Sequence, residues 1–269
     1  MTLPPPTTRE ELAQAILRAR PFRGLDLALA RRLAEVTSVQ RLSQGEHAWR
    51  QGQRAEHVHV VLRGVLELQR GVPGAETTLV AFFGPGETPA VPAVLEQRPY
   101  GGTAYAATPV TEVLRVHAAP ILEELPRSPE LAMAVNRALL DHCRLLHAKV
   151  DVLAAGTVPR RLAALMLELA DRFGDEMEDG SWFVPLALSR GQIATYVGAR
   201  VETVIRCCTG WERAGILGKR ADGIAIPCRA GMTAIARGDD AALDACRRTC
   251  TRPGACADGP RPRAPLARA

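Results

Sequence analysis

The chain has 269 residues and a formal net charge of +5, which is enough length for two domains with hydrophobic cores. Residues 1–127 hold 14 basic and 13 acidic residues, whereas residues 156–269 hold 17 basic and 13 acidic residues, so a polyanionic partner is expected to bind the second half. No run approaches the roughly 20 apolar residues of a membrane span, and the first residues lack the apolar core of a signal peptide, so we expect a cytoplasmic protein with no membrane partner.

The first half of the chain is predicted to be rich in β-structure. Residues 8–40 have a helical pattern with a break at Pro21-Phe22-Arg23-Gly24. Many short strands divided by glycine and proline turns then indicate a small barrel or jelly roll. The β-type runs are His57–Leu62, Val65–Gln69, Thr77–Phe83 and Val110–Val116.

A long helix is predicted from Ser128 to Ala155, because leucines recur there at seven-residue intervals. Leu139, Leu146 and Leu153 form one row, and Leu131, Ala138, Leu145 and Val152 form a second row beside it. Such a stripe supports the association of two helices, and the alternative is a helix that packs within one chain. The predicted dimer seam consists of Leu131, Val135, Leu139, His142, Leu146 and Leu153.

Two short helices joined by a tight turn are predicted between Leu188 and Leu217. Ser189 and Gln192 have the spacing of a capping box, and Gly198 ends the first helix. The second helix is expected from Val201 to Ala214. Its buried side is predicted to consist of Val201, Val204, Ile205, Cys208 and Trp211. The pattern is typical of a helix-turn-helix, which places its second helix in the major groove of DNA.

The polar residues of this segment suit DNA. Glutamate can accept from the cytosine amino group and arginine can pair with guanine, while other cations hold phosphates. Asp222-Gly223 between apolar runs predicts a β-hairpin, or wing. The expected DNA contacts are Ser189, Arg190, Arg200, Glu202, Thr203, Arg206, Lys219 and Arg220, with Arg213 as a further phosphate ligand. The alternative is a helical hairpin with a solvated polar face.

Turn residues in the first half carry a resemblance to a known family. Gly45-Glu46, Gln51-Gly52, the run 60–64 and the run 84–87 resemble the turns of the cyclic-nucleotide-binding β-roll. With the winged helix behind them, the chain resembles the CRP/FNR family of bacterial transcription regulators. The resemblance implies an α+β fold with a β-roll sensor domain at 1–127, a dimerisation helix at 128–155, a winged helix-turn-helix at 156–235 and a C-terminal tail at 236–269.

The resemblance also implies partners. It predicts a homodimer that binds a palindromic operator in double-stranded DNA, with Glu202 and Arg206 reading a TGA/TCA-type half-site. RNA polymerase would be a further partner of an activator. No catalytic motif such as G-x-S-x-G or H-E-x-x-H is present, so an enzyme is not expected.

The residues for a cyclic nucleotide are missing. Nucleotide-binding members of the family supply a glutamate for the ribose and an arginine for the cyclic phosphate. Val91 stands where the glutamate is expected, and Gly102 stands where the arginine is expected. Arg98 is a nearby cation that could replace it. Because a buried phosphate needs a compensating cation, cyclic AMP binding in the usual way is not expected.

Three cysteines, Cys246, Cys250 and Cys256, cluster near the end of the chain. Clustered thiols in a cytoplasmic regulator suit an iron–sulfur cluster with a fourth ligand from elsewhere. A branch of the CRP/FNR family carries three C-terminal cysteines with tighter spacing, so the resemblance implies a cluster, [4Fe–4S] in type, that senses oxygen, nitric oxide or redox state. The candidates for the fourth ligand are Asp141, Asp151, Cys228 and Cys143.

Other interpretations of the signal remain open. Structural zinc or a thiol/disulfide switch would use the same three cysteines. His142 could hold a haem. A further alternative is a DNA-binding protein that responds to no ligand. Cys207 and Cys208, in the second helix of the helix-turn-helix, are interpreted as ordinary packing residues.

Overall fold

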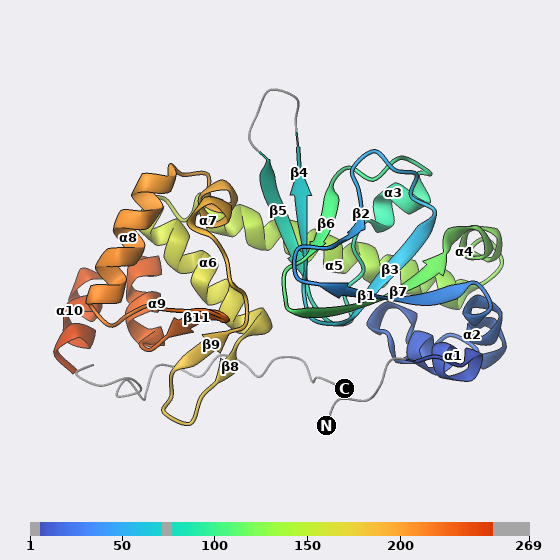
Figure 1. Ribbon diagram of the computed structural model, residues 1–269, viewed down its shortest axis with the longest axis horizontal. Helices are drawn as coiled ribbons and strands as arrows, with labels where there is room; N and C mark the ends of the chain where they lie inside the picture. Colours follow the sequence, from blue (N-terminus) through green and yellow to red (C-terminus); the bar gives the residue numbers. More distant parts are fainter. Residues whose placement is uncertain (1–5, 72–76, 250–269) are drawn as a thin grey trace. The chain divides into compact units, whose positions relative to one another are not determined.

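The computed structural model describes residues 6–71 and 77–249 (Figure 1). The chain divides into two compact units, Met1–His147 and Ala148–Ala269. Helix α5 (Pro129–Ala154) runs through the boundary between the two units. Among the described residues, none of the helices is both long and apolar enough to span a membrane.

The N-terminal unit starts with two short capped helices. In α1 (Arg9–Arg18), the Thr8 hydroxyl and the Glu11 side chain form a reciprocal capping box. The Asp26 carboxylate caps α2 (Leu27–Ala34) by accepting from two backbone N–H groups. A single 3-10 turn, η1 (Arg20–Phe22), separates them at the predicted break.

A two-sheet β-roll follows. The strands are β1 (Thr37–Ser43), β2 (His47–Trp49), β3 (His57–Arg63), β4 (Leu66–Arg70), β5 (Thr78–Phe83), β6 (Thr103–Ala106) and β7 (Val110–His117). One sheet has the order β1-β7-β3 and the other has the order β2-β6-β4-β5. All pairs are antiparallel, with Leu114 opposite both Val39 and Val60. The four predicted β-type runs are confirmed, whereas β1, β2 and β6 were not predicted.

Alternation along the strands separates two hydrophobic cores. Val60 and Leu114 point to a core that also contains residues of α1 and α2. Val61 and Val113 instead belong to the interior of the roll, with Trp49. Neighbouring residues of one strand face opposite sides of a sheet, so β3 and β7 serve both cores. The short helices α3 (Val91–Leu95) and α4 (Ala118–Glu124) complete the part before α5.

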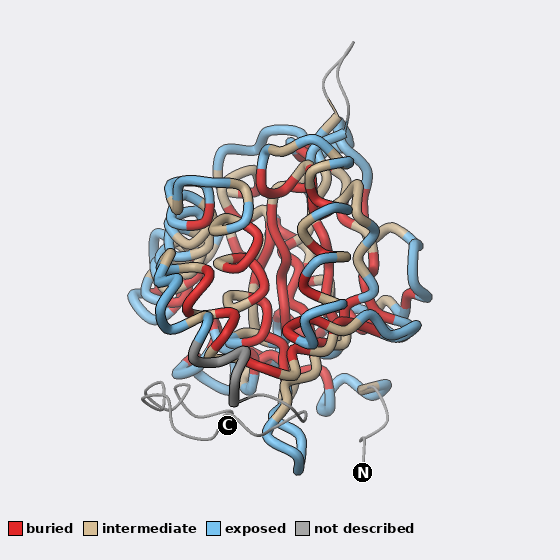
Figure 2. Tube along the Cα trace, turned by 90° about the vertical axis from the view of Figure 1, so that its left-hand side faces the viewer, coloured by how far each residue is buried: buried red, intermediate tan, exposed pale blue. Residues whose placement is uncertain are grey.

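The C-terminal unit combines helices with a small sheet. Its elements are α6 (Val158–Phe173), β8 (Asp175–Glu176), β9 (Trp182–Val184), α7 (Arg190–Val197), α8 (Val201–Arg213), β10 (Gly218–Arg220), β11 (Gly223–Ile226), α9 (Arg229–Arg237) and α10 (Asp240–Thr249). The sheet order is β10-β11-β9-β8. Apolar residues of α6, among them Leu162, Leu165 and Leu169, are fully buried. Buried positions lie on the inward sides of the helices, and exposed positions lie on their outer sides (Figure 2).

The mixed helix and sheet content confirms the α+β fold expected from the sequence, with a β-roll, a long helix and a winged helix-turn-helix in that order. The predicted C-terminal tail at 236–269 starts with helical residues. Helix α9 ends at Arg237, and α10 packs against α9.

Candidate nucleic-acid interface

The helix-turn-helix begins at Ser189, which is the N-cap residue of α7. The Ser189 hydroxyl accepts a hydrogen bond from the Gln192 N–H at 3.1 Å, and the Gln192 side chain accepts from the Ser189 N–H at 2.9 Å. Gly198 has a φ of 62°, the left-handed conformation that ends α7. The predicted capping box and helix end are therefore confirmed. Both signals lie within a few residues in sequence, which is why the sequence revealed them.

Arg161 of α6 holds the turn between α7 and α8 by hydrogen bonds to its backbone. Nη1 of Arg161 donates to the carbonyl oxygen of Val197 at 2.6 Å and to that of Gly198 at 3.1 Å. Carbonyls at a helix C-terminus lack intrahelical partners and carry partial negative charge, so a cation is favourable there. Sequence reasoning missed Arg161, because the contact joins residues that are 36 positions apart.

Helix α8 has one buried face and one exposed face. Val204, Cys208 and Trp211 are buried, as predicted. The prediction that Ile205 lies on the buried side is wrong, because its side chain is 46% exposed. Val201 is only half-buried.

The exposed face of α8 carries the predicted base-reading residues. Glu202 and Arg206 are both exposed, and Thr203 is half-buried beside them. Positions three and four apart share a helix face, so Ile205 lies with Glu202 and Arg206 rather than with the core. The exposed face therefore combines an acceptor, a cation and an apolar side chain.

Arg190 joins the two helices of the motif. Its guanidinium forms an ion pair with the Glu212 carboxylate of α8, and both side chains are half-buried. Sequence reasoning assigned Arg190 to a phosphate, whereas the structure places it in this pair. Burial raises the pKa of the neighbouring Cys208 thiol, and Arg190 partly opposes the effect. A neutral buried thiol agrees with the interpretation of Cys208 as a packing residue.

The wing follows α8 as the hairpin β10–β11. Arg220 and Gly223 are opposite each other, so the turn residues are Ala221 and Asp222, one position earlier than the predicted Asp222-Gly223 pair. Gly223 is required for another reason. A Cβ there would lie 2.2 Å from the Val184 carbonyl oxygen of β9, so only glycine allows this close approach.

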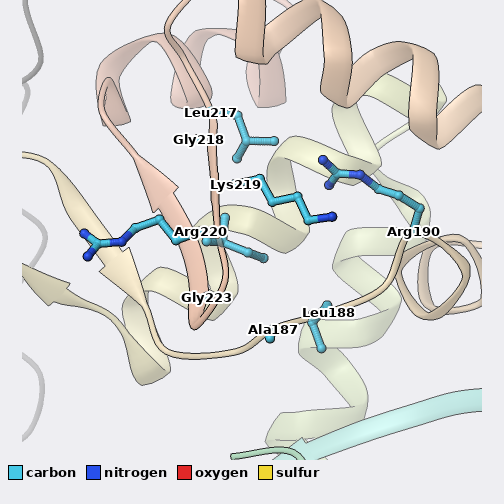
Figure 3. Close-up of a pocket in the computed structure, with 9 residues that line it drawn as sticks. Ala187, Leu188, Arg190, Leu217, Gly218, Lys219, Arg220 and Gly223 are labelled. Carbon is cyan, nitrogen blue, oxygen red and sulfur yellow. The ribbon is translucent and has the colours of Figure 1, made fainter.

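A hollow of about 40 Å³ lies between the start of α7 and the wing. Lys219 points toward Arg190 across it, whereas Arg220 points away (Figure 3). The Arg220 guanidinium carbon lies 4.9 Å from the centre of the Phe183 ring, and its Nε lies 3.5 Å from an Asp222 carboxylate oxygen. Arg200 and Arg213 are exposed at the two ends of α8. Cations around a recognition helix suit the phosphates on either side of a groove.

Two family models match the chain, and each covers one of its units in part. A "Cyclic nucleotide-binding domain" matches residues 39–127, and a "Crp-like helix-turn-helix domain" matches residues 160–235. The second model spans the helix-turn-helix and wing described above. The chain belongs to the CRP/FNR family of transcription regulators.

Curated relatives agree with this membership, and a solved structure shares the fold. The transcriptional activator protein FnrA of Stutzerimonas stutzeri is 28% identical over 76% of this chain and 81% of its own length. A CRP-like cAMP-activated global transcriptional regulator of Mycobacterium tuberculosis is 24% identical over 75% and 89%. The structure of FixK2 from Bradyrhizobium japonicum shares the fold, with a TM-score of 0.62 and 22% identity over 74% of this chain and 97% of its own.

In this CRP/FNR protein, one side of α5 faces the chain's own cores. Leu131 is fully buried in the core formed with α1 and α2, so its assignment to the dimer seam is wrong. Leu145 packs against the interior of the roll, and Val152 is buried. This second row of the heptad pattern therefore packs within the chain.

A neighbouring side of α5 exposes apolar residues. Leu146 and Leu153, from the first row, are 44% and 41% exposed, and Leu139 is half-buried. Val135 and His142, the other predicted seam residues, are half-buried. Further large apolar side chains with exposed surface on α5 are Met133, Leu140 and Val150.

The nucleotide region of the roll lacks room for the family's arginine. Val91 is buried in α3. A Cβ on Gly102 would lie 2.7 Å from the Gln69 carbonyl oxygen, so a side chain at this position requires the backbone to move. The Gly102 carbonyl accepts a hydrogen bond from the Trp49 indole at 3.0 Å. Arg98 is exposed and pairs with Glu96 at 3.2 Å, so in this structure it is directed to a neighbouring carboxylate.

Aromatic rings and the buried His59 fill the interior of the β-roll. The His59 ring lies 4.4 Å from the Trp49 ring and 5.9 Å from the Tyr100 ring, measured between centres. His59 is 1% exposed, and neither ring nitrogen has a hydrogen-bond partner among the described residues. Burial, reinforced by the nearby Arg115 cation, lowers the pKa of His59 to about 3. Sequence reasoning did not identify this group.

The proposed cluster ligands fall mostly outside the described residues. Cys246 lies in α10, but its side chain and all of Cys250 and Cys256 are beyond what the structure describes. Within the described part of the chain, no group of three or more histidine, cysteine, aspartate or glutamate side chains could hold a metal ion. The structure therefore describes only the four candidates for a fourth ligand.

Two of these four candidates are already engaged. The Cys228 sulfur is buried and accepts a hydrogen bond from the Gly231 N–H at 3.2 Å, which caps α9. Asp141 accepts from Arg20 at 3.0 Å and from Arg144 at 2.6 Å. Asp151 and Cys143 are exposed on α5. Ligation by Cys228 or Asp141 would require existing bonds to break.

Proposed function

We propose that this CRP/FNR regulator binds a palindromic operator as a homodimer and reads bases with the exposed face of α8. The observation that carries the proposal is the exposure of Glu202 and Arg206 on one turn of a helix whose other face is buried. Arg206 suits O6 and N7 of guanine, and Glu202 suits the amino group of cytosine. Lys219, Arg220, Arg200 and Arg213 would hold phosphates. Two-fold symmetry spaces the half-sites by one helical turn.

Selection of binding sites from a random DNA pool tests this proposal. We expect a palindrome with a guanine and a cytosine at fixed positions in each half-site. Arg206→Ala should lose about 1–3 kcal/mol of specific binding and relax the preference at the guanine. Arg237→Ala, an exposed arginine of α9 far along the chain from α8, is the matched control and should change neither. Unchanged operator affinity in Arg206→Ala would refute the assignment.

The homodimer is proposed to form along the exposed side of α5. Leu139, Cys143, Leu146, Val150 and Leu153 follow one another at alternating spacings of four and three, which is the seam of a two-stranded coiled coil. In a parallel pair, equivalent seam positions face each other, so the two copies of Cys143 would be close together.

Cross-linking and sedimentation test the seam. With Cys246, Cys250 and Cys256 replaced by serine, a short bismaleimide should link two chains through Cys143, and Cys143→Ser should abolish the product. Leu146→Glu should shift the protein to monomer in sedimentation equilibrium, because a charge would be buried in the seam. Ser38→Glu, at an exposed residue of β1, is the control and should remain dimeric. A Leu146→Glu protein that remains dimeric contradicts this seam.

The signal is proposed to act on the C-terminal thiols rather than on a nucleotide in the roll. Support comes from the donor set, since Cys246, Cys250 and Cys256 lie within eleven residues of one another and thiolates are the usual ligands of iron–sulfur clusters. Such a group, proposed as [4Fe–4S], would supply a centre that reacts with oxygen or nitric oxide. Of the two candidates for the fourth ligand that are exposed in the single chain, Cys143 belongs to the proposed seam, which leaves Asp151.

Anaerobic purification with iron and sulfide analysis tests the cluster. We expect a broad visible absorption band that oxygen bleaches, and its loss in Cys250→Ser. Cys207→Ser, a cysteine of α8, is the matched control and should retain the band. A colourless protein containing zinc, or containing neither iron nor sulfide, overturns the cluster proposal and leaves the DNA-binding proposal standing.

Cyclic AMP is not proposed as a ligand. The missing arginine, the crowded backbone at Gly102 and the Trp49 indole bound to its carbonyl all disfavour a cyclic phosphate there. Titration calorimetry with cyclic AMP should show no heat of binding at micromolar concentrations. Sub-micromolar binding would contradict this part of the proposal.

A further inference from the structure

Ile205 is an exposed isoleucine on a surface where polar residues are expected. It is 46% exposed, and from α6 onward the only other large apolar side chain of comparable exposure among the described residues is Met177 at 43%. Met177 lies next to β8, outside the helix-turn-helix. Ile205 thus stands alone as an exposed large apolar residue on the helices of the motif, within the residues that the structure describes.

The neighbours of Ile205 show what it would meet. Glu202 precedes it by three positions and Arg206 follows directly, so the three share the outer face of α8. If Glu202 and Arg206 reach base edges, Ile205 reaches the base pairs between or beside them. The thymine C5 methyl is the one apolar group that bases present in the major groove, and apolar side chains recognise it by contact.

The shape of the Ile205 side chain suits a contact with a methyl group. An isoleucine in a helix is held almost entirely in one χ1 rotamer, so its methyl groups occupy fixed positions. A rigid apolar group costs little conformational entropy on binding, whereas a flexible side chain would lose more. The neighbouring charged residues remain available for polar contacts on either side.

We propose that Ile205 is a specificity-determining residue that reads a thymine through its 5-methyl group in each half-site. The inference rests on the proposed base-reading role of α8 and adds an apolar contact to the polar contacts proposed for Glu202 and Arg206. Removal of one buried methyl should weaken binding about four-fold, and removal from both half-sites about fifteen-fold.

The test replaces each thymine of the selected operator with deoxyuridine, which lacks only the methyl group. For the wild-type protein, one thymine per half-site should show the four-fold loss and the others should show none. Ile205→Ser should bind the thymine and deoxyuridine operators equally, while Ile205→Val should keep part of the difference. Because the side chain is exposed, both variants should melt at the wild-type temperature.

The outcomes separate this inference from the function on which it rests. If no sequence is selected, or Arg206→Ala binds as well as wild type, the base-reading role of α8 fails. If Arg206→Ala weakens binding but every deoxyuridine operator binds wild type normally, only the thymine contact is overturned. The same result follows if Ile205→Ser keeps the wild-type sensitivity to deoxyuridine.

Discussion

The Lys149 ammonium lies 4.3 Å from the centre of the Tyr196 ring, which links the end of α5 to the first helix of the helix-turn-helix. The Tyr196 hydroxyl in turn donates to the Glu168 carboxylate of α6 at 3.4 Å, and Arg172 pairs with the same carboxylate at 3.2 Å. Three helices of the C-terminal unit therefore meet at one partly buried set of charges. Through these charges, the part of α5 that belongs to the C-terminal unit contacts α7, the helix that precedes α8.

The half-buried Lys149 gives the C-terminal unit a characteristic pH dependence. Burial lowers the pKa of Lys149 to about 8, and the Glu168 charge opposes this only in part. Between pH 8 and about 10.4 the unfolded chain holds a proton that the folded chain does not, so the free energy of unfolding should rise with pH. Lys149→Met should remove that rise, measured as the difference between the two proteins in urea denaturation. Equal pH slopes would contradict the assignment.

The buried histidine of the roll gives a dependence of the same sign in the acid range. With a folded pKa of about 3 and an unfolded value near 6.5, His59 is neutral in the fold while the unfolded chain takes up a proton. Stability should therefore fall as pH decreases below about 6.5, by at most about 1.4 kcal/mol per pH unit. His59→Phe should flatten this slope in denaturation at pH 7.5, 6 and 5. Replacement of the exposed His147 by Asn is the control.

The Arg190–Glu212 pair is expected to affect both folding and binding. Arg190→Ala should lower the stability of the C-terminal unit by about 1 kcal/mol, since the pair is partly exposed. If the Arg190 side chain also reaches a phosphate, the salt dependence of DNA binding should decrease by about one counterion. Glu212→Gln removes the pair but keeps the cation. It should lower stability similarly and leave the salt dependence unchanged, which fluorescence anisotropy at several salt concentrations can measure.

Gly223 of the wing and Gly210 of α8 are expected to respond to alanine in opposite ways. Gly223→Ala would place a Cβ 2.2 Å from the Val184 oxygen and should destabilise the unit by about 1–3 kcal/mol. Gly210→Ala, in α8, meets nothing within 4 Å and should stabilise by about 0.5–1 kcal/mol, because alanine favours the helix. Thermal melts of the two variants should therefore shift in opposite directions.

Local signals explain what could be predicted. The Ser189–Gln192 capping box and the left-handed Gly198 depend on residues a few positions apart, and their pattern identified the helix-turn-helix and the exposed Glu202 and Arg206. The strands of the roll could be predicted because short apolar runs bounded by turn glycines are typical of β-strands. Ile205 was misassigned because a β-branched apolar residue at helical spacing resembles a core residue, and only packing shows that α6 and α7 leave it uncovered.

The sequence by itself determined the order of the β-roll, the long helix and the winged helix-turn-helix, the family and the polar face of α8. It also showed two heptad rows on α5, but not which row faces outward. Only the tertiary structure decided that Leu131 and Leu145 pack within the chain while Leu146 and Leu153 remain exposed. The same holds for Lys149 with Tyr196, Arg190 with Glu212 and His59 with Trp49. Each pair joins residues distant in sequence, and their burial and charge interactions exist only once the chain has folded.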